Sequence, residues 1–395
     1  MPDTLKRRLG LGLLTVYGVG IMVGAGIYVL VGAAAGQAGI WAPVSFLLAA
    51  VVVTPTALTY CELSSRIPEA AGESAYVDAG IGWHWLALLV GAIMVIAGTV
   101  AAAAVLRGGV GYLTSVTPMR FDVAVIGLGL LLMLIAMIGA LESLSFAAIL
   151  TIIEVSGLLI IIWAGFSAVP VADWQNPPPP QWSGIIGASV FAFFAFIGFE
   201  DLVNMSEETR NPTRNMPRAI LMALGITAVL YALVSLAAVR AVPVDMLSQS
   251  SRPLALVWEV ATGRPAAFMA WIAVAAALNG VLAQIVMASR VLFGLGKRTA
   301  FLAVFHRAHP RFGTPVLATV LIGTAVIISA LALPVAKLAE ITSMALLLVF
   351  AIVNTTLIAL KYRQPVAPFR VPVIVPWFGM LASLAAFGAT IGVSQ

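Results

Sequence analysis

The chain has 395 residues, of which 62% are hydrophobic and 9% charged, with a mean hydropathy of +1.07. A soluble domain carries about 25% charged residues, so this composition excludes an ordinary soluble protein and predicts a polytopic membrane protein. The net charge of +5 comes from residues in loops, where it carries topology information, so nucleic acid is excluded as a partner. One cysteine and three scattered histidines form no ligand cluster, so we expect no metal site and no cofactor.

Eleven apolar segments are each long enough to cross a bilayer at about 20 residues per span. They cover residues 11–35, 41–64, 83–106, 122–141, 146–169, 184–203, 218–241, 266–290, 314–333, 340–360 and 371–393. The basic N-terminus followed by an apolar run resembles a signal peptide, but the run is too long for one, so we expect a retained helix. With a cytoplasmic N-terminus, fifteen of the 21 lysines and arginines fall inside, as the positive-inside rule requires. The odd number of spans then places the C-terminus outside.

The first span contains a glycine-rich stretch, Gly18 to Tyr28, with four glycines within nine residues. Each interior glycine costs a helix about 1 kcal/mol relative to alanine. The stretch therefore has two explanations. Gly20, Gly24 and Gly32 form a small-residue face that packs against a neighbouring helix, or the helix breaks and exposes its backbone to a cavity lined by protein.

The sixth span is also interrupted by glycines, and it ends in two carboxylates, Glu200 and Asp201. Spans one and six occupy matching places in two halves of five spans, residues 11–169 and 184–360, followed by an appended helix at 371–393. Interrupted segments at matching positions are typical of transporter sites built on broken helices. An odd number of spans per half makes the repeats inverted. We therefore predict an all-α membrane protein, one transmembrane domain over residues 1–395, with a five-plus-five inverted-repeat transporter fold in which helices one and six are broken.

Such breaks would create a binding site made of backbone. Free N–H groups around Val23 to Ile27, at the start of a half-helix, attract a carboxylate. Free carbonyls near Phe194 to Gly198, at the end of a half-helix, suit an ammonium group. Together they would bind both charges of a zwitterion without a charged side chain.

Glu154 lies deep inside the fifth span, where a charged side chain costs about 2.5–3.5 kcal/mol. Three roles remain open for it: a proton carrier, a sodium ligand or a neutral structural hydrogen-bonding group. Glu200 is either a structural carboxylate at the end of span six or a gating and proton-sensing group. Asn279 and Gln284 in span eight either hydrogen-bond between helices or belong to a cation site.

Four motifs in order resemble the amino acid–polyamine–organocation (APC) superfamily of amino acid permeases. They are the glycine-rich break at residues 24–28, the loop after span two at 62–76, the exit of span six at 196–217, and the loop before span nine at 288–315. The resemblance extends along nearly the whole chain. Many proton-coupled members have a lysine near Glu154, so the glutamate departs from the family pattern.

The resemblance also implies which residues bind substrate: Met22, Val23, Gly24, Ala25, Gly26, Ile27, Phe193, Phe194, Ala195, Ile197 and Gly198. In the family, the backbone of Met22 to Gly26 corresponds to the carboxylate contacts. Carbonyls near Phe193, Phe194 and Ile197 correspond to the amino-group contacts, and Phe194 to an aromatic gate. The resulting pocket looks apolar, which favours a neutral amino acid over a cationic one.

The sequence thus predicts a secondary active transporter that imports small neutral or apolar L-amino acids by alternating access. We expect proton coupling, with Glu154 and Glu200 as coupling or gating groups. An amino acid exchanger and a sodium symporter remain alternatives. A channel would need a continuous polar lining and a sensor a sizeable cytoplasmic domain. The sequence has no nucleophile–base pair on which to base an enzyme.

The expected partners are the amino acid, protons or sodium, and the lipid bilayer. The expected location is the plasma membrane, as an integral protein of a bacterial inner membrane with a cytoplasmic N-terminus. Either a monomer or a homodimer fits. Most members of the resembling family have twelve spans, one more than the eleven found here.

Overall fold

The computed structural model describes residues 7–24, 26–69, 71–138, 140–250 and 252–393. The side chains at 29, 115, 140–144, 190, 191, 194, 336, 339, 340 and 389–393 lie outside that description as well. The α-helices are α1 (Leu11–Val23), α2 (Gly26–Ala38), α3 (Ala42–Arg66), α4 (Gly72–Gly80), α5 (His84–Val116), α6 (Phe121–Ile138), α7 (Ala140–Ser167), α8 (Ala172–Gln175), α9 (Trp182–Ala195), α10 (Pro212–Ala241), α11 (Val244–Gln249), α12 (Pro253–Thr262), α13 (Ala267–Arg298), α14 (Val316–Ala332), α15 (Val335–Arg363) and α16 (Ile374–Val393). Three 3₁₀ segments join them: η1 (Gly39–Trp41), η2 (Glu200–Glu208) and η3 (Ala300–Phe305).

Each of the eleven predicted spans coincides with helical structure. Within the described residues, eight helical segments are long and apolar enough to cross a membrane. α14 and the described part of α16 are apolar but shorter, and the sixth predicted span is divided between α9 and η2. The all-α membrane fold is therefore confirmed. The boundaries predicted for the two repeats stay a prediction.

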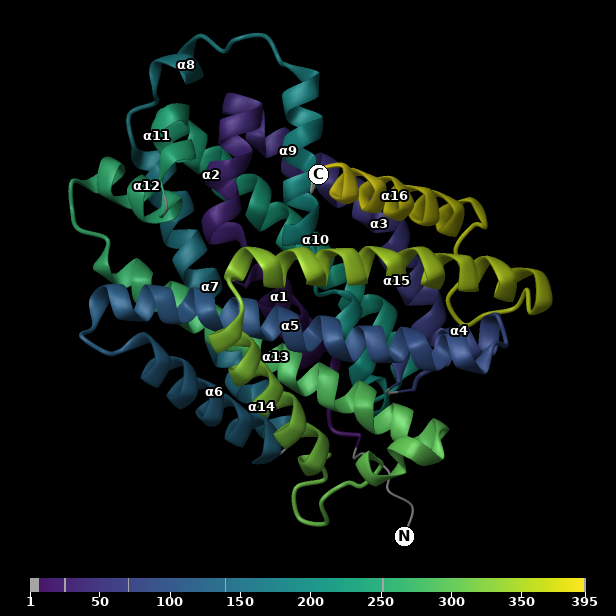
Figure 1. The fold of residues 1–395 in the computed structure, drawn as a ribbon. Coiled ribbons are helices and arrows are strands. Elements are labelled where there is room, and N and C mark those ends of the chain that lie inside the picture. The colour runs from purple at the N-terminus through teal and green to yellow at the C-terminus, as the bar shows by residue number, and fades with distance from the viewer. Residues whose placement is uncertain (1–6, 25, 70, 139, 251, 394–395) are drawn as a thin grey trace.

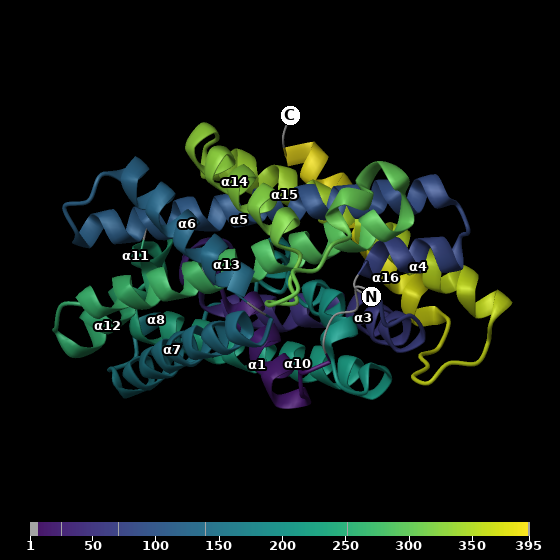
Figure 2. The same cartoon turned by 90° about the horizontal axis from the view of Figure 1, so that it is seen from below.

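The helices form one bundle with two distinct ends (Figure 1). The N-terminal end carries the segment that leads into α1, together with α4 and the start of α5. The opposite end carries α8, α11 and α12. α5 and α13 pack along each other through the bundle, and α15 packs against both α5 and α16. Seen from below, α3, α4 and α16 gather on one side (Figure 2), where α16 packs on α3 and α15.

The first predicted break is present. α1 ends at Val23 and α2 begins at Gly26. Between them Gly24 has φ 18° and ψ −168°, far from helical values, while its N–H still donates to the Gly20 carbonyl. Ala25, which was predicted to contact substrate, lies outside the described residues.

The second predicted break is also present. α9 ends at Ala195, a turn follows, and η2 begins at Glu200. Within the turn Gly198 has φ +125°, a conformation that residues with a side chain rarely adopt. The turn therefore depends on glycine at this position.

The two explanations for the glycines of span one both hold, for different residues. A Cβ atom on Gly20 would collide with Thr151 of α7 and Asn279 of α13. One on Gly32 would lie 2.6 Å from the Leu247 carbonyl of α11. These two glycines allow close helix packing, as small residues do in membrane bundles, whereas Gly24 lies at the break.

Candidate functional site

The two breaks meet at one tyrosine. The Tyr231 hydroxyl of α10 lies 2.5 Å from the Met22 carbonyl and 3.0 Å from the Ala195 carbonyl, at the ends of α1 and α9. Tyr231 is fully buried, and its ring packs edge-on to Phe46. A hydroxyl has a single hydrogen to donate. At any moment it can therefore satisfy only one of these two carbonyls well, and the other remains an acceptor.

The structure narrows the set of backbone groups that are free for a ligand. The Phe193 carbonyl accepts a hydrogen bond from the Phe196 N–H at 3.0 Å, so it is already occupied. The N–H groups of the first turn of α2, Gly26 to Tyr28, have no acceptor within their own helix, because every α-helix leaves its first N–H groups unpaired. The acceptors at Met22 and Ala195 and the donors at the start of α2 thus all belong to helix ends that flank the two breaks.

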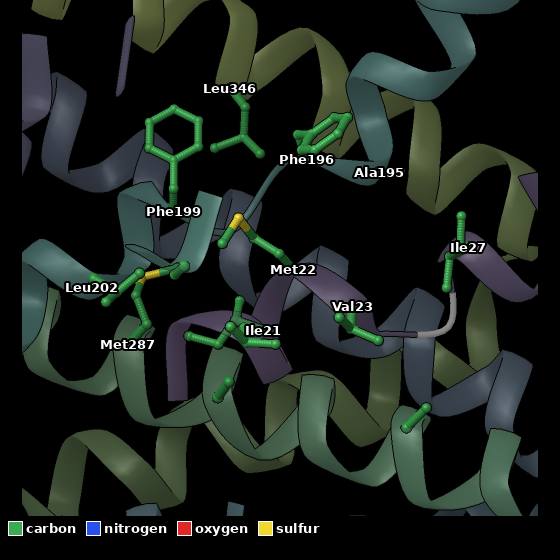
Figure 3. Close-up of a cluster of buried hydrophobic side chains, with 14 of the residues drawn as sticks. Ile21, Met22, Val23, Ile27, Ala195, Phe196, Phe199, Leu202, Met287 and Leu346 are labelled. Atoms are coloured by element: carbon green, nitrogen blue, oxygen red, sulfur yellow. The ribbon is translucent and has the colours of Figure 1, made fainter. Parts of the chain in front are cut away.

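The surroundings of the breaks are apolar. Figure 3 shows side chains from α1, α2, the α9–η2 region, α13 and α15 gathered around them. The labelled residues all belong to the buried core: Ile21, Met22, Val23, Ile27, Ala195, Phe196, Phe199, Leu202, Met287 and Leu346. The predicted gate Phe194 has its side chain outside the described set.

A Tyr231→Phe variant is expected to unfold at a lower temperature, with about 1 kcal/mol less stability, and to bind substrate more weakly. The ring contacts with Phe46 and Phe196 remain, while the hydroxyl that joins the two breaks is lost. Thermal unfolding and ligand binding of the purified protein measure the two effects. Tyr362→Phe, at a tyrosine that is 75% exposed, is the matched control. Unchanged affinity in Tyr231→Phe would show that the hydroxyl does not position the breaks.

Glu154 is completely buried in α7, and neither of its carboxyl oxygens has a hydrogen-bond partner among the described residues. Three elements bring polar groups toward it: Tyr28 from α2, Tyr231 from α10 and Asn279 from α13. The Tyr28 hydroxyl donates to the Glu154 backbone carbonyl at 3.3 Å. Glu154 therefore lies next to both the start of α2 and the tyrosine that joins the breaks.

The polar residues of span eight hydrogen-bond between helices. The Asn279 side-chain amide donates to the Thr151 hydroxyl at 2.9 Å, and the Gln284 amide donates to the Asp201 carboxylate at 2.5 Å. The Asn279 carbonyl oxygen has no partner in the described part of the chain. Hydrogen bonding between helices thus accounts for Gln284, while the Asn279 side-chain carbonyl remains available as an acceptor near Glu154.

At the N-terminal end of the bundle, the segment before α1 is hydrogen-bonded to η2. The backbone N–H groups of Arg8 and Leu9 both donate to the Glu208 carbonyl, at 2.9 and 3.0 Å. The Glu208 carboxylate pairs with Arg290 of α13 at 2.5 Å, and both side chains are buried. These contacts therefore join the N-terminal segment to η2 and η2 to α13.

Glu200 accepts a hydrogen bond from the Gly198 N–H at 2.8 Å, which fixes the turn of the second break. Its other carboxyl oxygen has no partner in the described chain and faces a group of buried polar side chains, which we call the α4 polar cluster. The cluster consists of Tyr60, Glu73, Tyr76, Glu200 and Asn204, each with at least one polar atom unpaired among the described residues. Asp201 is buried within electrostatic range of this cluster.

Glu73, which lies in the loop predicted after span two, was not singled out from the sequence. It belongs to α4, is fully buried, and interacts with both Tyr60 and Glu200. Burial raises the pKa of the Glu73 carboxyl from its ordinary 4.5 to about 8. Because the folded protein keeps this proton over a pH range in which an unfolded chain has lost it, stability falls as the pH rises through about 8.

A Glu73→Gln variant is expected to remove that part of the pH dependence. Between about pH 5 and about pH 9, the unfolding temperature of the wild type should decline more steeply than that of the variant. Asp173→Asn, at an exposed carboxylate of α8, is the control and should leave the slope unchanged. Parallel slopes for the wild type and Glu73→Gln would exclude a proton held at this position.

Two broken helices facing each other inside an all-α membrane bundle define a transporter of the broken-helix type. The family described as amino acid permease matches residues 9–395, and the chain belongs to that family. The resemblance to the APC superfamily found in the motifs is thereby confirmed. In the described residues, no group of three Asp, Glu, His or Cys side chains forms a metal site.

The curated relatives include transporters of several substrates. The chain is 27% identical to the branched-chain amino acid permease BcaP of Bacillus subtilis, over 93% of this chain and 84% of that protein. It is 30% identical to a vacuolar cationic amino acid transporter 4 of Arabidopsis thaliana, over 92% of this chain and 65% of that protein. It is 29% identical to a methylthioribose transporter of Bacillus subtilis, over 94% and 85% of the two chains. These relatives are named as transporters, and none as an enzyme.

Proposed function

We propose that this chain is a secondary active transporter that imports small neutral or apolar L-amino acids by alternating access, with proton coupling. In this proposal it lies in a bacterial inner membrane with its N-terminus in the cytoplasm, as a monomer or a homodimer. The observation that carries it is the convergence of the two breaks at Tyr231. The Met22 and Ala195 carbonyls lie at the ends of α1 and α9, and the first N–H groups of α2 have no acceptor within that helix, an arrangement suited to an ammonium and a carboxylate on one small molecule.

The apolar surroundings support a neutral side chain on the substrate. A cationic side chain buried beside Ile21, Phe196 and Leu346 would need a carboxylate partner to offset its desolvation. A branched or small apolar side chain needs none. The name of the relative BcaP supports the same substrate class, whereas the names of the cationic amino acid and methylthioribose transporters make those substrates the competing candidates.

Glu154 is the proposed proton carrier. A carboxyl group buried without a partner is least costly when it carries a proton, and an ionised one needs compensation from its surroundings. Its interactions with Tyr28 of α2 and with Tyr231 support this role, because a proton on Glu154 would lie near the groups proposed to bind substrate. Proton binding and substrate binding would then affect each other directly.

A sodium symporter is the second candidate, favoured by one feature. Asn279 interacts with Glu154, its carbonyl oxygen is unpaired among the described residues, and its amide is bonded to the Thr151 hydroxyl. Oxygen atoms are the ligands that hard cations prefer. In this reading Glu154 is a ligand of sodium. Proton coupling predicts that a proton gradient drives uptake, whereas sodium coupling predicts that a sodium gradient drives it.

Uptake by the purified protein in liposomes tests the proposal. Each of the amino acids, and methylthioribose, competes in turn with a labelled branched-chain amino acid. Accumulation is then measured under a proton gradient alone, a sodium gradient alone, and with substrate inside the vesicles. We expect competition by neutral apolar amino acids and accumulation under the proton gradient. Competition by arginine or methylthioribose alone would overturn the substrate class, and stimulation only by internal substrate would make the protein an exchanger.

A further inference from the structure

Away from the broken helices, an open groove of about 610 Å³ lies on the periphery of the bundle. It lies between the start of α5 and the adjacent helices α15 and α16, which run side by side in Figure 1. We call it the α15–α16 groove. The residues used below are Trp83, Leu348, Thr355, Arg363, Met380 and Leu384.

The body of the groove is apolar. Leu348 of α15 and Leu384 of α16 are 38% and 47% exposed along its wall, which suits contact with hydrocarbon. The one hydroxyl there, on Thr355, donates to the Ala351 carbonyl at 2.8 Å and lies 3.3 Å from the Met380 sulfur. Its one donor hydrogen is therefore used within the protein, and the walls formed by Leu348 and Leu384 are apolar.

One end of the groove lies at the level of the lipid headgroups. Trp83 and Trp85 stack with ring centroids 6.1 Å apart and are 58% and 61% exposed. Exposed tryptophans in membrane proteins gather at the boundary between headgroups and hydrocarbon. Arg363, in the last turn of α15, lines the same groove. The groove therefore extends from headgroup level into the apolar layer.

Arg363 differs from three cations near it, which are held in ion pairs. Arg66 and Lys361 share the Glu62 carboxylate, and Arg298 pairs with both Glu69 and Asp78. In the described part of the chain, Arg363 has only a 3.1 Å hydrogen bond from its Nη1 to the Gly80 carbonyl. Most of its N–H donors and its full charge remain available at the mouth of an apolar groove.

We propose that the α15–α16 groove is a binding site for one anionic phospholipid of the bilayer. The phosphate accepts hydrogen bonds from the Arg363 guanidinium, whose planar fork matches phosphate oxygens. An acyl chain lies along Leu348 and Leu384. The predicted orientation places the site in the cytoplasmic leaflet, where negative lipids attract basic residues. In a zwitterionic lipid the headgroup ammonium offsets the phosphate charge, so the lipid and Arg363 together would keep a net positive charge that an anionic lipid neutralises.

Native mass spectrometry of the purified full chain, mixed with phosphatidylglycerol or phosphatidylcholine, tests this assignment. The wild type should retain one phosphatidylglycerol in preference to phosphatidylcholine. Arg363→Gln should bind it about ten-fold more weakly, because a charge-assisted contact is lost. Arg370→Gln removes an exposed cation that lies outside the groove and should retain the lipid. Thr355→Trp fills the groove, keeps Arg363, and should also lose the lipid.

The outcomes that overturn the assignment are distinct. Equal affinity for the two lipids, or equal loss in Arg363→Gln and Arg370→Gln, would mean general attraction to the membrane surface. Because the native Cys61 is buried, a Leu384→Cys variant presents one accessible thiol in the groove. Disulfide-linked dimers of that variant in liposomes would show that a second copy of the chain covers the groove instead of a lipid. Unfolding curves of each variant confirm that the fold is intact.

Discussion

Replacing Glu154 by glutamine is expected to abolish accumulation of substrate driven by a pH gradient, while exchange of substrate across the same liposome membrane continues. One coupled proton lets a gradient of one pH unit support about ten-fold accumulation. The variant should reach only equal concentrations on both sides. Glutamine keeps the size and polarity of the side chain but cannot carry a proton between the two faces, so binding and conformational change remain while coupling is lost.

The Glu154→Gln experiment also separates the three roles of this residue. Glu259→Gln, at a half-buried carboxylate at the end of α12, is the control and should accumulate substrate normally. If Glu154 is a structural hydrogen-bonding group, the variant keeps full pH-driven accumulation. If it is a sodium ligand, a sodium gradient drives the wild type and not the variant. The variant should be about as stable as the wild type, because an unpaired neutral amide replaces an unpaired protonated carboxyl of nearly the same size.

The position of the breaks could be predicted from the sequence because it depends on local backbone energetics. Glycine is expensive inside a helix, and its clustering at Gly24 and Gly26 and again at Gly198 indicates where the helices stop. The matching places of spans one and six then identified the pair. Composition alone could not separate Gly24 from Gly20, because one lies at the break and the other at a helix contact made by residues far away in the chain.

Tyr231 and Glu73 could not be identified from the sequence. Tyr231 is one aromatic residue inside an apolar span, and its role depends on carbonyls 209 and 36 positions away. Glu73 follows a turn in a polar stretch, where a solvated carboxylate is the ordinary expectation. Its burial arises only because α4 folds back against α5, α15 and η2. Both depend on tertiary packing, which leaves no periodic pattern in the local sequence.

The second break gives the other large expected effect, in a Gly198→Ala variant. At φ +125° a side chain is strained by about 1–3 kcal/mol. The new Cβ would also lie 2.6 Å from the Ile21 Cγ2 atom and 3.3 Å from the Met22 backbone nitrogen. The two breaks must then move apart, so we expect a lower unfolding temperature and a fall in substrate affinity of about ten-fold or more, measured by binding to the purified protein.

Gly225→Ala provides the matched control, because a Cβ there would meet no atom within 4 Å and Gly225 lies inside helix α10. Alanine should stabilise that helix by up to about 1 kcal/mol and leave substrate affinity unchanged. If Gly198→Ala lowers stability but binds substrate normally, glycine serves only to shape the turn. If the spacing between Met22 and Ala195 determines how well the substrate fits, the loss of affinity should instead exceed the loss that lower stability explains. The ratio of the two effects therefore tests whether the breaks form the binding site.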